Sequence, residues 1–380
     1  MNKERKQFMK TCKPVFFTAL TLFAALAITV QTSAQNQTST FDATAKGKIK
    51  TFDVKGAGKG SGQGTFPFMN NDKGAITGWY CDAAGYCHGF LRAPHGHITS
   101  FDVPGAGSET VPESINPLGE IAGFYQDPNY LYHGFLLAAD GETFTIIDSP
   151  GAGTGTNQGT LVRAINPAGT IAGHYIDANN AFHGFVRAPD GYITTFDDPK
   201  AGTGTGQGTK VAGGTGINRR GVIAGRYIDG KNVNHGYLRH LDGSFTTIDG
   251  PGAVFSDCSD IAPNGTIVGY FQDTNNVYHG FSSTPPYKKI TQLDDPNAGT
   301  GANQGTFGYD INPAGTIMGY YIDTRGKNHG FQLAPDGTTY TTIDVPGATG
   351  TFPQTNNNKG AITGWYLDKN NASHGFLWTP

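Results

Sequence analysis

One motif recurs along this chain and restricts the folds that it can adopt. A His-Gly-Phe or His-Gly-Tyr triplet occurs seven times at spacings of 44 to 52 residues, and an aspartate precedes each histidine by six positions. A fixed period of this length is typical of a protein built from repeated structural units. The seven pairs are Asp82 and His88, Asp127 and His133, Asp177 and His183, Asp229 and His235, Asp273 and His279, Asp323 and His329, and Asp368 and His374.

Within each repeat the sequence predicts four short strands separated by turns. In the third copy we expect strands at 159–166, 170–177, 183–188 and 192–198, joined by Pro-Ala-Gly, Ala-Asn-Asn and Pro-Asp-Gly. These residue types favour tight turns because they fix φ or tolerate positive φ. The 56 Gly and 21 Pro of the chain argue against long helices. Four antiparallel strands in a unit of about 45 to 50 residues are typical of a β-propeller blade.

The phase of the repeat predicts a closed ring. A strand of the fourth type, residues 48–54, precedes any complete repeat, and the chain ends on a strand of the third type, residues 373–380. Pairing these two strands would complete the last blade and remove two exposed edges. We therefore predict an all-β fold, a seven-bladed β-propeller over residues 48–380 with four antiparallel strands per blade. Residues 38–44 match the spacing of a third-type strand, so a degenerate extra strand there would compete for the same edge.

The N-terminus has the organisation of a secretory signal peptide. Five basic residues precede an apolar run at 15–30, and small polar residues follow it up to Ala34. Sixteen apolar residues fall short of the roughly 20 that a membrane-spanning helix needs. We expect cleavage after residues 1–34, a polar lead-in at 35–47, and an exported mature protein without a membrane span, in the periplasm, at the cell surface or in the medium.

The net charge and the cysteines of the mature chain restrict the classes of partner and the cellular compartments that we expect for it. Without residues 1–34, 22 basic and 29 acidic side chains remain, a formal balance of −7. A mildly acidic chain without basic clusters is a poor candidate for binding nucleic acid or an anionic membrane. Cys81 and Cys87 flank one short loop and could form a disulfide in an oxidising compartment, which leaves Cys258 over. Three buried thiols are the alternative.

The repeated Asp and His are interpreted as a structural clamp within each blade. Neighbouring blades pack about 10 Å apart, so histidines of different blades cannot share one metal. The Asp can accept hydrogen bonds from the His ring or from loop amides, which would hold the second and third strands together. A calcium site is the alternative, because Asp177, Asp273 and Asp368 are each followed two residues later by Asn. No loop supplies the further carboxylate that calcium needs, so we expect no metal and no cofactor.

The Gly-rich runs of the chain are interpreted as crossings between blades. The runs at 150–160 and 200–209 lack the Gly-Lys-Ser or Gly-Lys-Thr sequence of a phosphate loop, and no helix is expected after them. These crossings and the loops between Asp and His share one face of the predicted ring. This face has the longest and most variable loops, so we expect a ligand there.

Ligand-binding residues are expected where the repeats differ. Two residues before the Ile-Asn position each copy carries a different side chain, and mixed aromatic and charged groups suit a sugar. From these positions and their neighbours we select as candidates Glu113, Arg163, Asp257, Asp260, Tyr309 and Asp310. A second varied position, in the second strand, is expected to pack between blades and comprises Trp79, Phe124, His174, Arg226, Tyr270, Tyr320 and Trp365.

Several repeated features resemble one known group of proteins. The Ile-Ala-Gly-x-Tyr strands, the Ile-Asn-x-x-Gly turns, the His-Gly-Phe triplets and the closing His-Gly-Phe-Leu-Trp at 374–378 resemble the HAF-type extracellular repeat proteins. That group is named for a His-Ala-Phe in each repeat, and this chain carries Gly in place of the Ala. The resemblance covers nearly all of the mature chain. It implies an exported repeat protein without an established activity, and it assigns no catalytic residue.

Three functions fit the sequence. The first is an exported, non-catalytic propeller that binds a carbohydrate, such as a polysaccharide, or another extracellular surface through its loop face and central mouth. The second is a polysaccharide lyase or hydrolase that uses Glu113, Asp257, Asp260 and Asp310, with His174, since glycoside hydrolysis needs carboxyl groups about 5 to 9.5 Å apart. The third is a purely structural propeller or one that binds an envelope protein. We expect the first, because the chain combines an export signal with varied central residues and no nucleophile motif.

Overall fold

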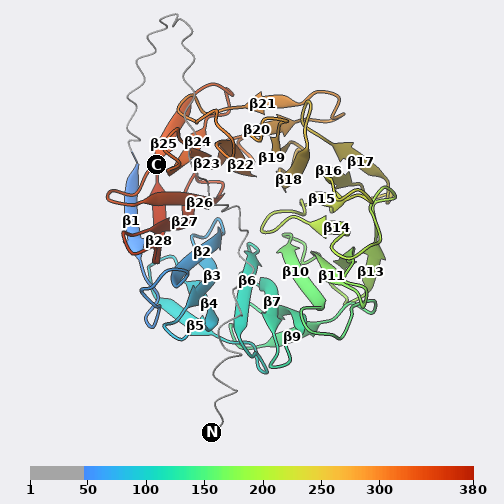
Figure 1. Cartoon of the computed structure of the whole chain (residues 1–380). Coiled ribbons are helices and arrows are strands. Elements are labelled where there is room, and N and C mark those ends of the chain that lie inside the picture. Colours follow the sequence, from blue (N-terminus) through green and yellow to red (C-terminus); the bar gives the residue numbers. More distant parts are fainter. Residues whose placement is uncertain (1–46) are drawn as a thin grey trace, which may run out of the picture. The chain divides into compact units, whose positions relative to one another are not determined.

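The computed structural model describes residues 47–380, and every regular element among them is a β-strand. Figure 1 shows these strands arranged around a common centre. Consecutive strands pair antiparallel in groups of four, and each group forms one blade. The predicted all-β propeller is therefore confirmed.

The blades follow one another in chain order, and the first strand of each lies nearest the centre of the ring (Figure 1). The first three blades are β2 (Gly64–Asn70), β3 (Ile76–Cys81), β4 (Cys87–Arg92) and β5 (Ile98–Phe101); β6 (Glu109–Ile115), β7 (Ile121–Gln126), β8 (Tyr132–Leu137) and β9 (Phe144–Ile147); and β10 (Gly159–Ile165), β11 (Ile171–Ile176), β12 (Phe182–Arg187) and β13 (Ile193–Phe196). The next two are β14 (Gly208–Val211), β15 (Ile223–Ile228), β16 (Asn234–Arg239) and β17 (Phe245–Ile248); and β18 (Phe255–Ile261), β19 (Ile267–Gln272), β20 (Tyr278–Ser283) and β21 (Thr291–Leu293). The chain continues with β22 (Gly305–Ile311), β23 (Ile317–Ile322), β24 (Asn328–Leu333) and β25 (Tyr340–Ile343), and then β26 (Gly350–Asn356), β27 (Ile362–Leu367) and β28 (Ser373–Thr379).

The ring closes through the first strand of the described chain. Strand β1 (Lys48–Phe52) pairs antiparallel with β28, from Lys48 opposite Thr379 to Phe52 opposite Gly375. It thereby supplies the fourth strand of the blade that β26 begins, next to β28 in Figure 1. The predicted closure is confirmed, with β1 two residues shorter than the expected 48–54.

Some sequence predictions fall on residues that the structure does not describe. The signal peptide at 1–34, nearly all of the lead-in at 35–47 and the extra strand at 38–44 lie outside the described residues. Across 47–380, no helix has the length and apolar character needed to cross a membrane.

The His-Gly-Phe triplet supplies the core of each blade. Its third residue is almost completely buried in every copy, and the third residues are Phe90, Phe135, Phe185, Tyr237, Phe281, Phe331 and Phe376. The preceding Gly is needed because the fourth strand packs directly against it. A Cβ at Gly184 would lie 2.3 Å from the ring of Phe196. An alanine at the middle position of the triplet would clash with the fourth strand, which explains the Gly of His-Gly-Phe in this chain.

The Gly-rich runs form the crossings between blades, as the sequence predicts. Gly159, at the end of one crossing, has φ of +114°, and a Cβ there would lie 2.0 Å from the carbonyl oxygen of Tyr132 in the preceding blade. Gln158 holds the same crossing together, because its Oε1 accepts from the amide of Gly155 (2.8 Å) and its Nε2 donates to the carbonyl of Ala178 (3.2 Å). This crossing is thus tied to the loop between Asp177 and His183 that follows it.

Candidate functional site

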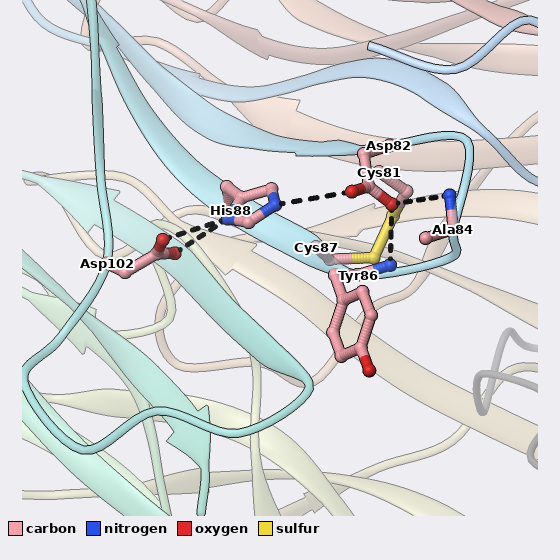
Figure 2. The surroundings of a disulfide bond; sticks show 7 residues. All are labelled: Cys81, Asp82, Ala84, Tyr86, Cys87, His88 and Asp102. Carbon is pink, nitrogen blue, oxygen red and sulfur yellow. Dashed lines mark hydrogen bonds and ion pairs between the residues drawn. A yellow bond between two sulfur atoms is a disulfide. The ribbon is translucent and has the colours of Figure 1, made fainter. Parts of the chain in front are cut away.

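Each repeated aspartate organises its own loop. In Figure 2, Oδ1 of Asp82 accepts hydrogen bonds from the amides of Ala84 (2.8 Å) and Tyr86 (2.9 Å). The same pair of amides, two and four residues after the Asp, is bound in the other six loops. The loop amides are therefore the main partners of these carboxylates, one of the two alternatives that the clamp hypothesis offered.

Each repeated histidine lies between two carboxylates. Its Nε2 is 3.4 to 4.0 Å from the predicted Asp, whereas its Nδ1 is 2.6 to 3.1 Å from a second Asp, the residue directly after the fourth strand. Its ring also packs 4.8 to 5.1 Å from an aromatic ring of the second strand. Figure 2 shows His88 between Asp82 and Asp102. The second carboxylates are Asp53, Asp102, Asp148, Asp197, Asp249, Asp294 and Asp344.

This second set of aspartates was not predicted from the sequence. Six of them follow their histidine by 14 or 15 residues, and that repeat was present in the sequence. For His374 the partner is Asp53, 321 residues earlier, which only ring closure brings to it. The clamp therefore spans three strands of each blade instead of the expected two.

The Asp-x-Asn sequences serve the loop itself. Nδ2 of Asn179 donates to Oδ2 of Asp177 (3.2 Å), and the Asn179 amide donates to Oδ1 (2.9 Å). Within the described part of the chain, no group of three or more His, Cys, Asp or Glu side chains is placed to hold a metal ion.

The structure joins Cys81 and Cys87 in a disulfide across the base of the first loop between Asp and His (Figure 2). Cys258 is a buried free thiol.

The varied positions singled out from the sequence are β-bulges of the innermost strands. Each bulge inserts one residue between two paired positions, and such insertions redirect a side chain. The inserted residues are Phe68, Glu113, Arg163, Ser259, Tyr309 and Gln354. Three of them, from three different blades, converge beside Gly213: a Cβ there would lie 2.9 Å from Glu113, 3.1 Å from Arg163 and 3.4 Å from Phe68. These bulge residues therefore point toward the centre of the ring.

One blade differs from the others because it carries an insertion at this position. Ten positions separate Gly208 from Asn218, compared with seven between the equivalent Gly159 and Asn166. The segment that contains these three extra residues, Ala212–Gly216, is called the axial loop here. In Figure 1 the loop that follows β14 extends toward the centre of the ring.

The axial loop contacts blades on both sides of the ring. The Gly214 amide donates to the carbonyl of Arg163 (3.0 Å), and Oγ of Ser114 donates to the carbonyl of Gly214 (2.8 Å). Oγ1 of Thr215 donates to Oδ1 of Asp310 (3.1 Å) on β22. The axial loop therefore crosses the centre of the ring near the C-terminal ends of the innermost strands, where the Ile-Asn turns begin. This loop was not predicted from the sequence, although the spacing of 52 residues between His183 and His235 is the longest of the six.

A group of charged side chains lies next to the axial loop, mainly on the blades that begin with β6, β10 and β14. Nη1 of Arg163 is 2.6 Å from Oε1 of Glu113, and Arg226 pairs with Asp257 of β18. Lys210 places its Nζ 4.0 Å from the centre of the Phe182 ring. We call these five charged residues, together with His174, the charged arc.

Burial governs protonation in the charged arc. Burial, reinforced by the charges of Arg226 and Arg163, lowers the pKa of Lys210 to about 7. Burial also lowers the pKa of His174 well below its usual range, so this imidazole is neutral at pH 7. Its Nδ1 is buried and meets no hydrogen-bond partner among residues 47–380. Burial raises the pKa of Glu113 against the opposing charge of Arg163.

Aromatic side chains complete the other side of the ring. Their rings touch from blade to blade, as the Phe66 to Trp365 (5.6 Å), Tyr320 to Phe352 (5.6 Å) and Tyr270 to Phe307 (5.1 Å) contacts show. This agrees with the packing role that the sequence suggests for the second-strand set. Many of these rings are also partly exposed, so packing between blades does not use their whole surface. The partly exposed members, which we call the aromatic arc, are Phe68, Trp79, Tyr270, Tyr309, Tyr320, Phe352 and Trp365.

The six candidate ligand residues divide into two groups. Glu113, Arg163 and Asp257 belong to the charged arc, and Tyr309 stacks parallel to Tyr270 at 6.2 Å in the aromatic arc. Asp260 and Asp310 instead tie neighbouring blades together.

Both of these tying aspartates are buried and accept hydrogen bonds from backbone amides. Oδ2 of Asp260 accepts from the amide of Ile311 (2.8 Å), and Oδ2 of Asp310 accepts from the amide of Asn356 (2.6 Å). Burial and then the nearby charge of Asp310 raise the pKa of Asp260 well above its usual range. Asp260 and Asp310 were selected as ligand candidates, and the structure places each of them against the backbone of the next blade.

Comparison with known proteins identifies the fold. No protein-family model matches the chain, and no curated protein matches it in sequence. Among solved structures it is similar to streptogramin B lyase, with a TM-score of 0.54 and 16% identity over 87% of this chain and 97% of that one. It is also similar to a catalytically inactive virginiamycin B lyase from Staphylococcus aureus with quinupristin, with a TM-score of 0.55 and 13% identity over 88% and 100%.

A third similar structure is puromycin hydrolase, with a TM-score of 0.51 and 13% identity over 81% of this chain and 50% of that one. At such identities the likeness extends to the fold alone, and one fold hosts many functions. The similarity to HAF-type repeats stays a prediction. The described residues form a β-propeller, an architecture shared with a lyase and a hydrolase, and their function must be argued from their own side chains.

Proposed function

We propose that this chain is an exported, non-catalytic propeller that binds a carbohydrate at the centre of its ring. The observation that carries this proposal is the juxtaposition of the aromatic arc with the charged arc. Partly exposed Trp and Tyr rings can stack on the apolar faces of a sugar, and charged groups can pair with its hydroxyls.

The charged arc suits binding because its groups are fixed before a ligand arrives. The pairs of Arg163 with Glu113 and of Arg226 with Asp257 hold both guanidinium groups in place. Side chains that are already ordered lose little conformational entropy when they bind. Charged donors and acceptors also make stronger hydrogen bonds than neutral ones.

The axial loop supports one direction of approach. The axial loop crosses the ring near the face of the Ile-Asn turns, through Thr215 and Asp310. Lys210 lies near the opposite face, because it is two residues after Gly208, where the crossing ends and β14 begins. A ligand that reaches Lys210 and the aromatic arc would therefore enter from the face of the crossings and the loops between Asp and His. The sequence analysis favoured the same face.

Export supports an extracellular ligand. The N-terminal sequence has the organisation of a signal peptide, and the repeats resemble an extracellular group. The disulfide between Cys81 and Cys87 is consistent with an oxidising compartment.

The carboxylate-based hydrolase is less well supported than binding. Glu113, Asp257, Asp260 and Asp310 are each 7% exposed or less, and each is engaged in an ion pair or in hydrogen bonds to backbone amides. A glycosidase needs two carboxyl groups that flank the substrate.

A lyase is the second candidate, and Lys210 is the observation that favours it. An amine with a pKa of about 7 is partly unprotonated at neutral pH and can accept a proton. The guanidinium groups of Arg163 and Arg226 lie in the same charged arc and could hold the carboxylate of an acidic sugar.

The test is a titration of purified residues 35–380 with neutral and acidic polysaccharides and their oligosaccharides. A ligand at 100 times its dissociation constant should stabilise the protein by about 2.7 kcal/mol, which a thermal shift detects. Tyr309→Ala should abolish this shift. Tyr192→Ala is the matched control, because Tyr192 is 72% exposed at the outer turn that precedes β13 and should leave binding unchanged.

Product formation is measured in the same samples. A lyase reaction leaves unsaturated sugar ends, which absorb ultraviolet light. If such ends form with the unaltered protein and not with Lys210→Met, the protein is a lyase and not a non-catalytic binding module. No thermal shift with any glycan would contradict the proposal and favour a structural or protein-binding propeller.

A further inference from the structure

A second candidate site lies on the opposite face from the loops between Asp and His. A crevice of about 270 Å³ opens between the blade of β10–β13 and the blade of β14–β17. It is lined by residues of the Pro-Ala-Gly turn between β10 and β11 and of the Arg219-Arg220-Gly221 turn between β14 and β15. We call it the arginine crevice, and its lining comprises Asn166, Ala168, Thr170, Val186, Thr194, Arg219, Arg220, Gly221, Arg239 and Leu241.

Three arginines line this crevice and no acidic residue does. Arg219 and Arg220 are exposed, and no ion pair involves them within residues 47–380. Arg239 stacks its guanidinium 4.7 Å from the centre of the Phe196 ring, and its Nε is buried without a hydrogen-bond partner in the described chain. The ring thus fixes the plane of one guanidinium while part of its hydrogen-bonding capacity is unused.

The arginine pair is specific to this blade. At the equivalent turns the other blades carry Pro followed by Ala, Leu or Asn, or an Asp or Asn followed by Lys. The turn itself does not require arginine, because Asn218 supports it as Asn166 supports its counterpart, through Oδ1 and the backbone amides two and four residues later. Turn geometry therefore does not explain Arg219 and Arg220.

The chemistry of the crevice defines its ligand. Three like charges gathered without a counter-ion repel one another, and an anion bound among them removes that repulsion. Guanidinium groups bind tetrahedral oxyanions through two parallel hydrogen bonds, and the hydroxyls of Thr170 and Thr194 lie in the same lining. Leu241, which is 68% exposed, adds an apolar wall.

We propose that the arginine crevice binds a phosphate or sulfate group, either free or carried by a small molecule such as a sugar ester. This site is independent of the carbohydrate site proposed at the centre of the ring, since it opens on the other face.

The experiment is isothermal titration calorimetry on residues 35–380 at low ionic strength, where charge interactions are least screened. The probes are inorganic phosphate, inorganic sulfate, glucose 6-phosphate and glucose 6-sulfate. The double variant R219A/R220A should weaken binding by at least about tenfold, because it removes charge-assisted hydrogen bonds. Both side chains are exposed, so the variant should unfold at the same temperature as the unaltered protein.

Lys359→Ala is the matched control, because Lys359 is an exposed cation at the equivalent turn of another blade. It should leave the dissociation constants unchanged. Tighter binding of the sugar esters than of the inorganic ions would identify a carried group, and equal binding would identify the free anion. The proposal is overturned if no probe gives a saturable heat, or if K359A weakens binding as much as the double variant does.

Discussion

The two aspartates that flank one histidine should contribute unequally to stability. Oδ1 of Asp177 accepts from the amides of Asn179 and Ala181, at 2.9 and 2.8 Å, and its side chain is 21% exposed. Ala181 is buried, so its amide would lose its partner in Asp177→Ala without gaining water. An unsatisfied buried donor of this kind costs about 1 to 3 kcal/mol. Asp197, in contrast, is 49% exposed and pairs with Nδ1 of His183, and such exposed pairs contribute about 0 to 1 kcal/mol.

Urea unfolding of the two single variants measures this difference. If the m value is about 3 kcal/mol per molar, a loss of 1 to 3 kcal/mol lowers the midpoint by about 0.3 to 1 M. Asp177→Asn keeps an acceptor oxygen and should fall between the unaltered protein and Asp177→Ala. A midpoint for Asp197→Ala at or below that of Asp177→Ala would refute the conclusion that the loop amides, and not the histidine, are the main partners.

Three further predictions concern the disulfide, the charged arc and acid stability. Replacing Cys81 and Cys87 by Ala releases a loop of about six residues, which should lower the free energy of unfolding by about 2 kcal/mol; urea midpoints equal to those of the oxidised protein would count against a structural role. Burial lowers the pKa of Lys210 to about 7 in the folded protein. Between pH 7 and 10.5, folding must therefore remove a proton that the unfolded chain keeps, and this lowers the free energy of unfolding. Lys210→Met should therefore raise the melting temperature at pH 7, and a gain that does not shrink toward pH 10.5 would contradict this reasoning. Asp336, whose pKa the Thr339 hydroxyl and backbone amides lower to about 2, binds its proton only below the range of the unfolded chain. Asp336→Ala should therefore lower the stability, measured by circular dichroism during urea unfolding, by an amount that is constant above about pH 4 and vanishes from pH 4 toward pH 2, since the unfolded chain then binds more protons than the folded one.

The propeller could be predicted because its determinants are local and repeated. Turn residues mark the strand ends, and the same order of strands recurs in each copy. The closing pair of β1 and β28 followed from the phase of the repeat, although 331 residues separate Lys48 from Thr379. The varied positions were also visible, because a bulge admits different side chains while the paired positions around it keep the register.

The rest depended on contacts between elements that the sequence does not place. Thr215 bonds to Asp310 across the ring, between blades that are not neighbours, and three inserted residues gave little warning of it. Asp260 and Glu113 are both acidic residues near equivalent turns of different blades, yet Asp260 accepts a hydrogen bond from a backbone amide of the next blade and Glu113 pairs with Arg163. Which of these occurs is decided by the side on which the bulge places each residue. Arg219 and Arg220 form a candidate anion site only together with Arg239, which lies on another strand and lines the same crevice. The sequence does not show that these three residues meet.

The pairing of β1 with β28 also affects the synthesis of the chain. A ribosome adds about 5 to 20 residues per second, so β1 emerges roughly 17 to 66 seconds before the strand that it must join. During that interval the nascent chain carries two unpaired strand edges, which are templates for aggregation. A product that terminates before β28 can never close and keeps those edges. Only a chain that includes β28 can therefore shield both edges by pairing them with each other.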